Sequence, residues 1–213
     1  MTGTPSQSTA GSAARELARE VIGADGDRWT HTQAVAARAA TVVPVVTEEQ
    51  APALLAAAWL HDIGYATPLR DTGFHPLDGA RFLQARGWDP LVVGLVAQHS
   101  AARYVAQVRG LSAELDAFGD PAFVDGALPD ALTYADQTTS AQGQVVDVQT
   151  RLDDMLLRHG PDSPNARCHH LRAPAIRAAV DRTSDRLVLR RVRVRARDPL
   201  APDPLGTGAP GRR

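Results

Sequence analysis

The strongest constraint on the fold comes from histidines and aspartates that lie on the apolar faces of predicted helices. Residues four apart in a helix lie one above the other and share a face. Three titratable residues have an apolar partner at this spacing: His31 with Val35, Asp62 with Ala58, and Asp136 with Leu132. His61 directly precedes Asp62 and falls near the same side. The chain is therefore expected to bury imidazole and carboxylate groups between helices.

Burying these groups is unfavourable unless each finds a partner. An isolated ionised carboxylate is very costly inside a protein, so a buried aspartate needs a cation or several donors. Taken singly, each residue has an ordinary explanation, because a core histidine is often hydrogen-bonded and a buried aspartate is often a cap or an ion-pair partner. A metal ion shared among three helices is the simplest way to satisfy all of these groups together.

Helical patterning dominates the chain and predicts an all-α protein. Helices are expected at residues 12–23, 28–43, 48–61, 76–86, 90–99, 101–117, 122–139, 147–159 and 165–183. Residues 187–197 alternate aliphatic and arginine side chains, which fits either a short strand or an extension of the last helix. We expect a disordered tail at 1–11, a helical bundle at 12–184, and a basic tail at 185–213, whose last segment, rich in proline and glycine, should be disordered as well.

Three motifs resemble those of the HD-domain metal-dependent phosphohydrolases. His31, the run His61-Asp62-Ile63-Gly64 and Asp136 are similar to the His, His-Asp and Asp signature of that family. The runs at 74–80 (FHPLDGA) and 132–136 (LTYAD) resemble the family as well, and the likeness covers roughly residues 12–160. It implies an HD-domain helical bundle in which His31, His61, Asp62 and Asp136 hold one metal ion.

Two further histidines stand at predicted helix ends. Proline follows His75, which places this residue at a helix start, and His99 ends the segment that begins with Asp89 and Pro90. Their ordinary roles would be a cap and a cation at a helix C-terminus. In HD proteins with two metals, histidines at such places resemble ligands of a second ion, and the aspartate of the tandem pair bridges. We therefore expect Asp62, His75 and His99 to hold a second ion.

The resemblance implies hydrolysis of a phosphate ester or anhydride, with a nucleotide-like small molecule as substrate. The cofactor would be two divalent transition-metal ions (Fe, Mn, Co or Ni, with Mg compatible), and Asp62 and His61 would be catalytic. Arg38, Arg70 and Arg103 lie near the motifs in sequence, so they are the arginines expected to bind phosphate. Some members carry a lysine after the tandem motif and use it near phosphate; Tyr65 stands there in this chain.

Two other functions are compatible with the same ligand set. It also resembles that of the HD-type di-iron oxygenases, which need a redox-active metal and dioxygen. The third option is a non-catalytic module that keeps the metal for stability or binds a nucleotide as a regulator.

Composition agrees with a cytoplasmic enzyme. The chain has one cysteine, a formal net charge of −1 and no apolar run near the ~20 residues needed to cross a bilayer. A nearly neutral chain gives no reason to expect a nucleic-acid partner, and the oligomeric state stays open. His159 lies in a helix-stop sequence, and the triplet Cys168-His169-His170 lacks the second ligand pair of a structural zinc site, so neither is expected to bind metal.

Overall fold

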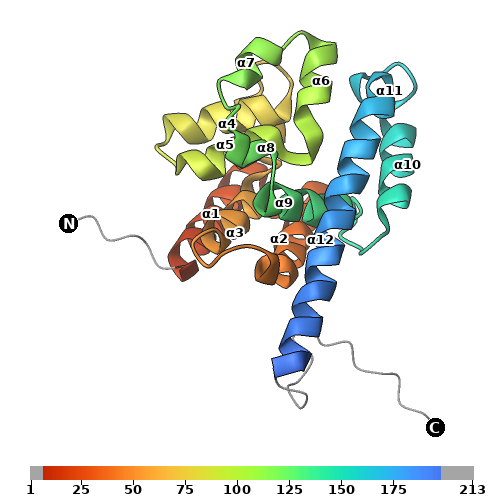
Figure 1. Ribbon diagram of the computed structural model, residues 1–213. Coiled ribbons are helices and arrows are strands. Elements are labelled where there is room, and N and C mark those ends of the chain that lie inside the picture. Colours follow the sequence, from red (N-terminus) through yellow and green to blue (C-terminus); the bar gives the residue numbers. More distant parts are fainter. Residues whose placement is uncertain (1–6, 198–213) are drawn as a thin grey trace.

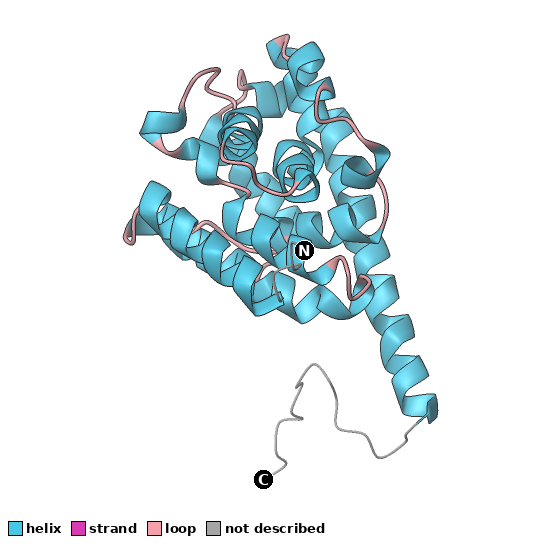
Figure 2. Cartoon of the chain, turned by 90° about the vertical axis from the view of Figure 1, so that its left-hand side faces the viewer, coloured by secondary structure: helices cyan, strands magenta, loops and turns pink. Residues whose placement is uncertain are grey.

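The computed structural model describes residues 7–197, and all regular elements in this range are helical (Figures 1 and 2). The predicted all-α class is confirmed. The α-helices are α1 (Gln7–Ile22), α2 (Gly26–Val42), α3 (Ala51–Leu60), α4 (His75–Ala85), α5 (Pro90–Gln98), α6 (Ala102–Arg109), α7 (Ser112–Asp116), α8 (Pro121–Val124), α9 (Ala127–Gln137), α10 (Val148–His159), α11 (Pro164–Arg167) and α12 (His169–Arg197). Short 3₁₀ turns are η1 (Val43–Val45), η2 (Ile63–Tyr65), η3 (Thr67–Leu69) and η4 (His99–Ala101).

Helix α3 lies at the centre of the bundle. It packs against α1, α2, α5 and α9, and six of its ten residues are alanine or proline. Small side chains let the neighbouring helices approach closely, while Leu54 and Leu60 fill the remaining space and are fully buried. Because α3 ends directly before His61, its central position carries the tandem His-Asp pair into the core.

Glycines divide two of the predicted helices. The helix expected at 101–117 ends at Gly110, where φ is 73° and the N–H donates back to the Ala106 carbonyl; α7 begins shortly after. The helix expected at 122–139 is interrupted before Gly126, where φ is 113°. Glycine adopts these left-handed conformations without the penalty that a Cβ imposes, so each glycine ends or redirects the chain.

The two ends of the described region are more helical than the sequence suggested. Residues 187–197 continue α12, so the helix-extension alternative is confirmed, and the predicted boundary at residue 185 lies inside this helix. Residues 7–11 belong to α1 rather than to a disordered tail. The remaining tail predictions, for 1–6 and 198–213, lie outside the described residues. None of the described helices is both long enough and apolar enough to cross a membrane.

Helices α10 and α12 add a wall to one side of the bundle (Figure 1). Leu152 and Met155 of α10 pack with Ala173 and Ile176 of α12 in a small apolar cluster separate from the main core. Farther along α12, Arg182 and Arg186 pair with the buried Asp130 of α9. The cluster and the ion pairs together fix this wall against the helices that carry the histidines and aspartates.

Candidate metal centre

The structure brings together the four residues of the first predicted ligand set. His31 comes from α2, His61 and Asp62 follow α3, and Asp136 lies in the last turn of α9; each is at most 5% exposed. The His31 Nε2 atom lies 3.2 Å from Asp136 Oδ1 and 3.9 Å from Asp62 Oδ2. The His61 Nε2 atom lies 3.5 Å from Asp62 Oδ2 and 3.9 Å from Asp136 Oδ1. Two imidazoles and two carboxylates thus converge on one buried point.

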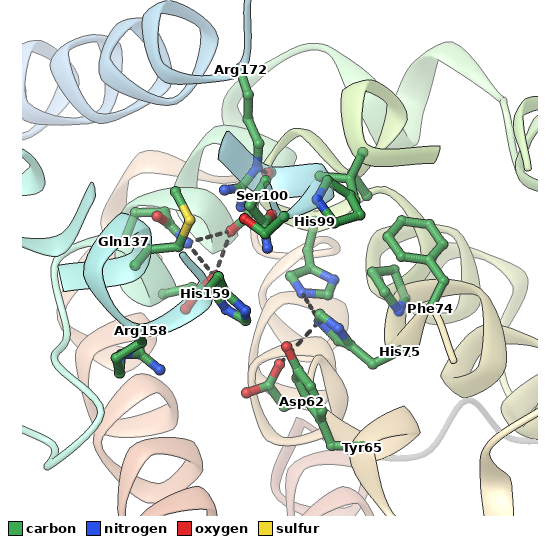
Figure 3. Close-up of a pocket in the computed structure, with 18 of the residues that line it drawn as sticks. Asp62, Tyr65, Phe74, His75, His99, Ser100, Gln137, Arg158, His159 and Arg172 are labelled. Carbon is green, nitrogen blue, oxygen red and sulfur yellow. Dashed lines mark hydrogen bonds and ion pairs between the residues drawn. The ribbon is translucent and has the colours of Figure 1, made fainter. Parts of the chain in front are cut away.

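A second group shares Asp62 with the first. The His75 Nε2 atom lies 3.3 Å from Asp62 Oδ1 and 3.3 Å from His99 Nε2. Asp62 therefore presents Oδ2 to His31 and His61 and Oδ1 to His75. His31, His61 and Asp62 form one set of ligand atoms that can hold a metal ion, and Asp62, His75 and His99 form another. Figure 3 shows the second group, with Asp62, His75 and His99 meeting at one side of a pocket.

Backbone carbonyls orient three of the histidines. His31 Nδ1 lies 2.9 Å from the Ser140 carbonyl, His61 Nδ1 lies 2.9 Å from that of Ala58, and His99 Nδ1 lies 2.6 Å from that of Val96. A carbonyl only accepts, so in each ring Nδ1 donates to it and Nε2 is the nitrogen that remains for the site. The Nε2 atoms of His31 and His61 face the carboxylates, and that of His99 faces His75 Nε2. A metal-ligating histidine is held in the same way, with its other ring nitrogen donating to an acceptor.

The buried Nε2 atom of His61 shows whether the convergence point of these side chains suits a cation. His61 Nε2 is inaccessible to solvent and has no hydrogen-bond partner within residues 7–197. A buried acceptor without a partner is unfavourable by about 1–3 kcal/mol. The side chain cannot turn to relieve this, because Nδ1 is fixed by Ala58. A cation at the convergence point gives His61 Nε2 its missing partner, and the mixed nitrogen and oxygen donors suit a divalent transition metal.

Electrostatics keep these groups in the protonation states that bind metal. Burial alone would raise the pKa of Asp62, but the nearby His61, Arg28 and His75 outweigh it and lower this pKa far below its usual value. The pKa of Asp136 is also well below its usual value, since its hydrogen bond with His31 and the fields of His61 and Arg151 overcome burial. Burial lowers the pKa of His61 and, more strongly, that of His75. Both carboxylates stay ionised, and burial favours the neutral, metal-binding form of His61 and His75.

A turn with unusual backbone geometry fixes Asp136 from the other side. Ser100 and Ala101, in η4, have φ of 51° and 57°, a left-handed conformation that residues with a Cβ rarely adopt. This turn directs the Ser100 hydroxyl toward Asp136 Oδ2 at 2.5 Å, and Gln137 Nε2 donates to the same oxygen at 2.7 Å. Backbone strain of this kind persists where the surrounding structure enforces it, often at functional sites.

His75 and His99 occupy the helix ends at which the sequence placed them. His75 is the first residue of α4, and His99 follows the last residue of α5. The ring of His75 does not cap α4 but points to Asp62, and Tyr65 stacks on it with centroids 3.9 Å apart. His99 Nδ1 donates a hydrogen bond to the Val96 carbonyl at the end of α5, and its Nε2 atom remains free to face the site. The capping and ligand roles are thus compatible in His99.

The site opens to a pocket of about 290 Å³ that is rich in positive charge. Asp62 and Asp136 line it together with five arginines: Arg28, Arg109, Arg151, Arg158 and Arg172. Arg28 forms an ion pair with Asp62 and lies over the ring of Tyr65, 3.9 Å from its centroid. Burial and the Asp62 charge raise the pKa of Tyr65 to about 12, so its phenol stays protonated. An anion is the ligand that such a pocket would attract.

The three arginines singled out from the sequence lie elsewhere. Arg38 donates to the side chains of Thr138 and Tyr134, Arg70 donates to the Tyr65 carbonyl, and Arg103 lies over the Tyr104 ring. None of these three lines the pocket. Their predicted phosphate role stays a prediction, and the pocket geometry favours other arginines for it.

Several pocket residues were not anticipated. Arg28 precedes His31 by almost one helical turn, a spacing that could have identified it. Ser100 and Gln137 directly follow the predicted ligands His99 and Asp136, which is a sequence signal of the same kind. Arg151 and Arg172 had no such signal, because α10 and α12 approach the site only in three dimensions. His159 does end α10, as the helix-stop sequence predicted, yet it also lines the pocket.

Comparison of the chain with protein-family models, with curated proteins and with solved structures gave no match. The family resemblance therefore remains that of the motifs around His31, His61-Asp62 and Asp136. A helical fold that contains a buried His/Asp cluster able to hold metal stands on the structure itself.

Proposed function

We propose that this protein is a metal-dependent phosphohydrolase with a dinuclear centre. The observation that carries the proposal is Asp62, whose two oxygens face two separate sets of histidine nitrogens beside an arginine-lined pocket. Two-metal sites of this kind clamp the attacking and leaving oxygens of a displacement at phosphorus. The arginines match the charge of a phosphorylated substrate.

The ligand assignment follows the geometry of the two groups. His31, His61, Asp62 and Asp136 would hold one ion, and Asp62, His75 and His99 would hold the other. When bound, divalent ions would lower the pKa of water to near neutrality and withdraw charge from the phosphoryl oxygens. Ser100 and Gln137 keep Asp136 in place through hydrogen bonds to Oδ2, so that Oδ1 remains directed at His31 and His61.

Arg28 would supply the fixed positive charge nearest to Asp62. Tyr65 carries no charge of its own, but its ring supports the Arg28 guanidinium on one side and stacks on His75 on the other. A guanidinium can bind a phosphate through two parallel hydrogen bonds. Arg28 would therefore orient a phosphoryl group over the cluster once Asp62 is engaged by metal.

The experiment is a phosphate-release screen with metal-loaded protein over nucleotides, cyclic nucleotides, dinucleoside polyphosphates and simple phosphate esters. Asp62→Ala is the test variant. Asp71→Ala is the matched control, since Asp71 is a largely exposed carboxylate paired with Arg81 on the surface. We expect turnover in the wild type and in Asp71→Ala, and background rates in Asp62→Ala. Dioxygen consumption by iron-loaded protein, with no phosphate released from any ester, would instead identify an oxygenase.

A further inference from the structure

Two buried arginines on the wall opposite the second ligand group each keep one nitrogen without a hydrogen-bond partner among the described residues. Arg151 of α10 and Arg172 of α12 are each 9% exposed. Arg151 Nε and Arg172 Nη1 are inaccessible to solvent and have no hydrogen-bond partner among the described residues. Both side chains line the pocket. A buried charge is retained at such a position when something else completes its bonding.

Asp136 cannot supply the missing hydrogen bonds of the two arginines. Its Oδ2 atom already accepts from Ser100 and Gln137, and its Oδ1 atom faces His31. Arg151 Nη2 reaches Oδ1 only at 3.7 Å, which is an ion pair beyond hydrogen-bond length. Arg172 donates through Nε to the Ser100 carbonyl at 3.0 Å, which fixes the guanidinium but leaves Nη1 unpaired. Arg151 Nη1 also reaches Asp154 Oδ2, but only at 3.5 Å, and Arg158 binds that half-exposed carboxylate more closely, at 2.9 Å.

Arg151 and Arg172 lie apart from Arg28, so they can bind a different part of a ligand. Arg28 lies at Asp62 and Tyr65, whereas Arg151 and Arg172 lie at Asp136 and Ser100. In Figure 3, Arg172 and Arg158 project from the α10–α12 side of the pocket, and Phe74, His75 and Tyr65 stand on the other. Positive charge therefore flanks the metal-binding cluster on two sides. A single phosphate held at the cluster beside Arg28 would leave the second side without an anion.

We propose that Arg151 and Arg172 form an anion subsite for a second anionic group of the substrate, adjacent to the phosphate that is hydrolysed. The substrate class is then a diphosphate, a longer phosphoanhydride or a closely spaced bisphosphate rather than a simple phosphate monoester. This assignment rests on the proposed phosphohydrolase function and narrows its substrate. The second anion would neutralise the positive charge that Arg151 and Arg172 bring to this side of the pocket.

The test measures binding rather than turnover. Methylenediphosphonate and methylphosphonate, neither of which has a bridging oxygen to hydrolyse, are titrated calorimetrically into the metal-loaded full-length protein. The variants are Arg151→Gln and Arg172→Gln, with bound metal measured in each preparation. Arg177→Gln is the matched control, because Arg177 lies on the same helix as Arg172, bonds to Gln149 and does not line the pocket.

We expect the wild type and Arg177→Gln to bind the diphosphonate at least about tenfold more tightly than the monophosphonate, the size of one hydrogen bond to a charged group. Arg151→Gln and Arg172→Gln should each lose most of this preference while binding the monophosphonate within about threefold of wild type. Since Arg172 also holds the Ser100 carbonyl, Arg151→Gln decides the outcome if Arg172→Gln does not fold.

Two results would overturn the subsite. The first is a wild type that binds the diphosphonate no more tightly than the monophosphonate. The second is an equal loss of affinity for both ligands in the variants, which would mean that these arginines bind the same phosphate as the metals. The fate of the proposed function is separate. A protein that prefers the diphosphonate but releases phosphate from no ester keeps the subsite and loses the hydrolase assignment. A protein that hydrolyses esters but does not prefer the diphosphonate keeps the hydrolase assignment and loses the subsite.

Discussion

Gly64→Ala should damage the second ligand group without touching any ligand. Gly64 lies in η2, directly after the tandem pair, where the backbone passes against the first turns of α4. A Cβ at this position would lie 2.6 Å from the Gly79 backbone nitrogen and closer still to the His75 carbonyl oxygen. Real Cβ atoms essentially never approach within 3.0 Å. Both obstacles are backbone atoms, so no side chain can rotate away.

The magnitude follows from what must move. Helix α4 has to shift by several tenths of an ångström or more, although it is packed against α5 and η2. Overpacking a well-packed region usually costs about 1–3 kcal/mol, and we expect the upper end, about 3 kcal/mol, because the backbone itself is displaced. His75 is the first residue of α4 and moves with it, so its Nε2 atom leaves the position 3.3 Å from Asp62 Oδ1.

The assay combines urea unfolding with metal analysis. Gly64→Ala should lower the free energy of unfolding by about 3 kcal/mol and the metal-to-protein ratio from two toward one. Gly11→Ala is the control, since a Cβ there meets nothing within 4 Å in α1; it should be neutral or stabilise by up to about 1 kcal/mol. A Gly64→Ala protein as stable as wild type, with two ions bound, would refute the close approach of η2 and α4.

The remaining predictions concern the ligands and the ions. Asp62→Ala should reduce occupancy of both ions, measured by elemental analysis, because each oxygen faces one ligand group; full metal content in this variant would contradict the shared role. His75→Ala and His99→Ala should each lower the metal ratio while the first ion stays bound, whereas a mere cap would lose about 1 kcal/mol of stability with metal content intact. Chelation should lower the melting temperature by several degrees, since metal at a thousandfold excess over Kd adds about 4 kcal/mol, and Mn²⁺, Fe²⁺ or Co²⁺ should restore it. Identical melting curves with and without metal would argue against a metal-held cluster.

Much of the helical core, and the convergence of the histidines and aspartates in two groups, could be predicted from the sequence. The spacing of Asp62 from Ala58 and of Asp136 from Leu132 correctly placed the carboxylates on buried faces, because helix periodicity is a local property. The two glycines that divide the longer predicted helices were harder to interpret. Gly110 and Gly126 act through positive φ values that the surrounding turn selects, and a lone glycine in a helical pattern does not reveal this.

The pocket wall could not be predicted in the same way. Arg38, Arg70 and Arg103 were chosen because they lie near the motifs in the chain, but a side chain's direction depends on which helix it joins and what it packs against. Arg151 and Arg172 are distant in sequence from the tandem pair, and they reach the site because α10 packs on α12. The sequence motifs therefore predicted which histidines and aspartates converge, but proximity along the chain did not predict the arginines around them.

The most direct test of the dinuclear phosphohydrolase is a metal titration of the stripped protein, with phosphate release from the best substrate of the screen followed at each addition. We predict no release without metal and a rate that rises until two equivalents of Mn²⁺, Fe²⁺ or Co²⁺ are bound. Hydrolysis by verified metal-free protein, or no phosphate from any ester with both ions bound, would contradict the assignment.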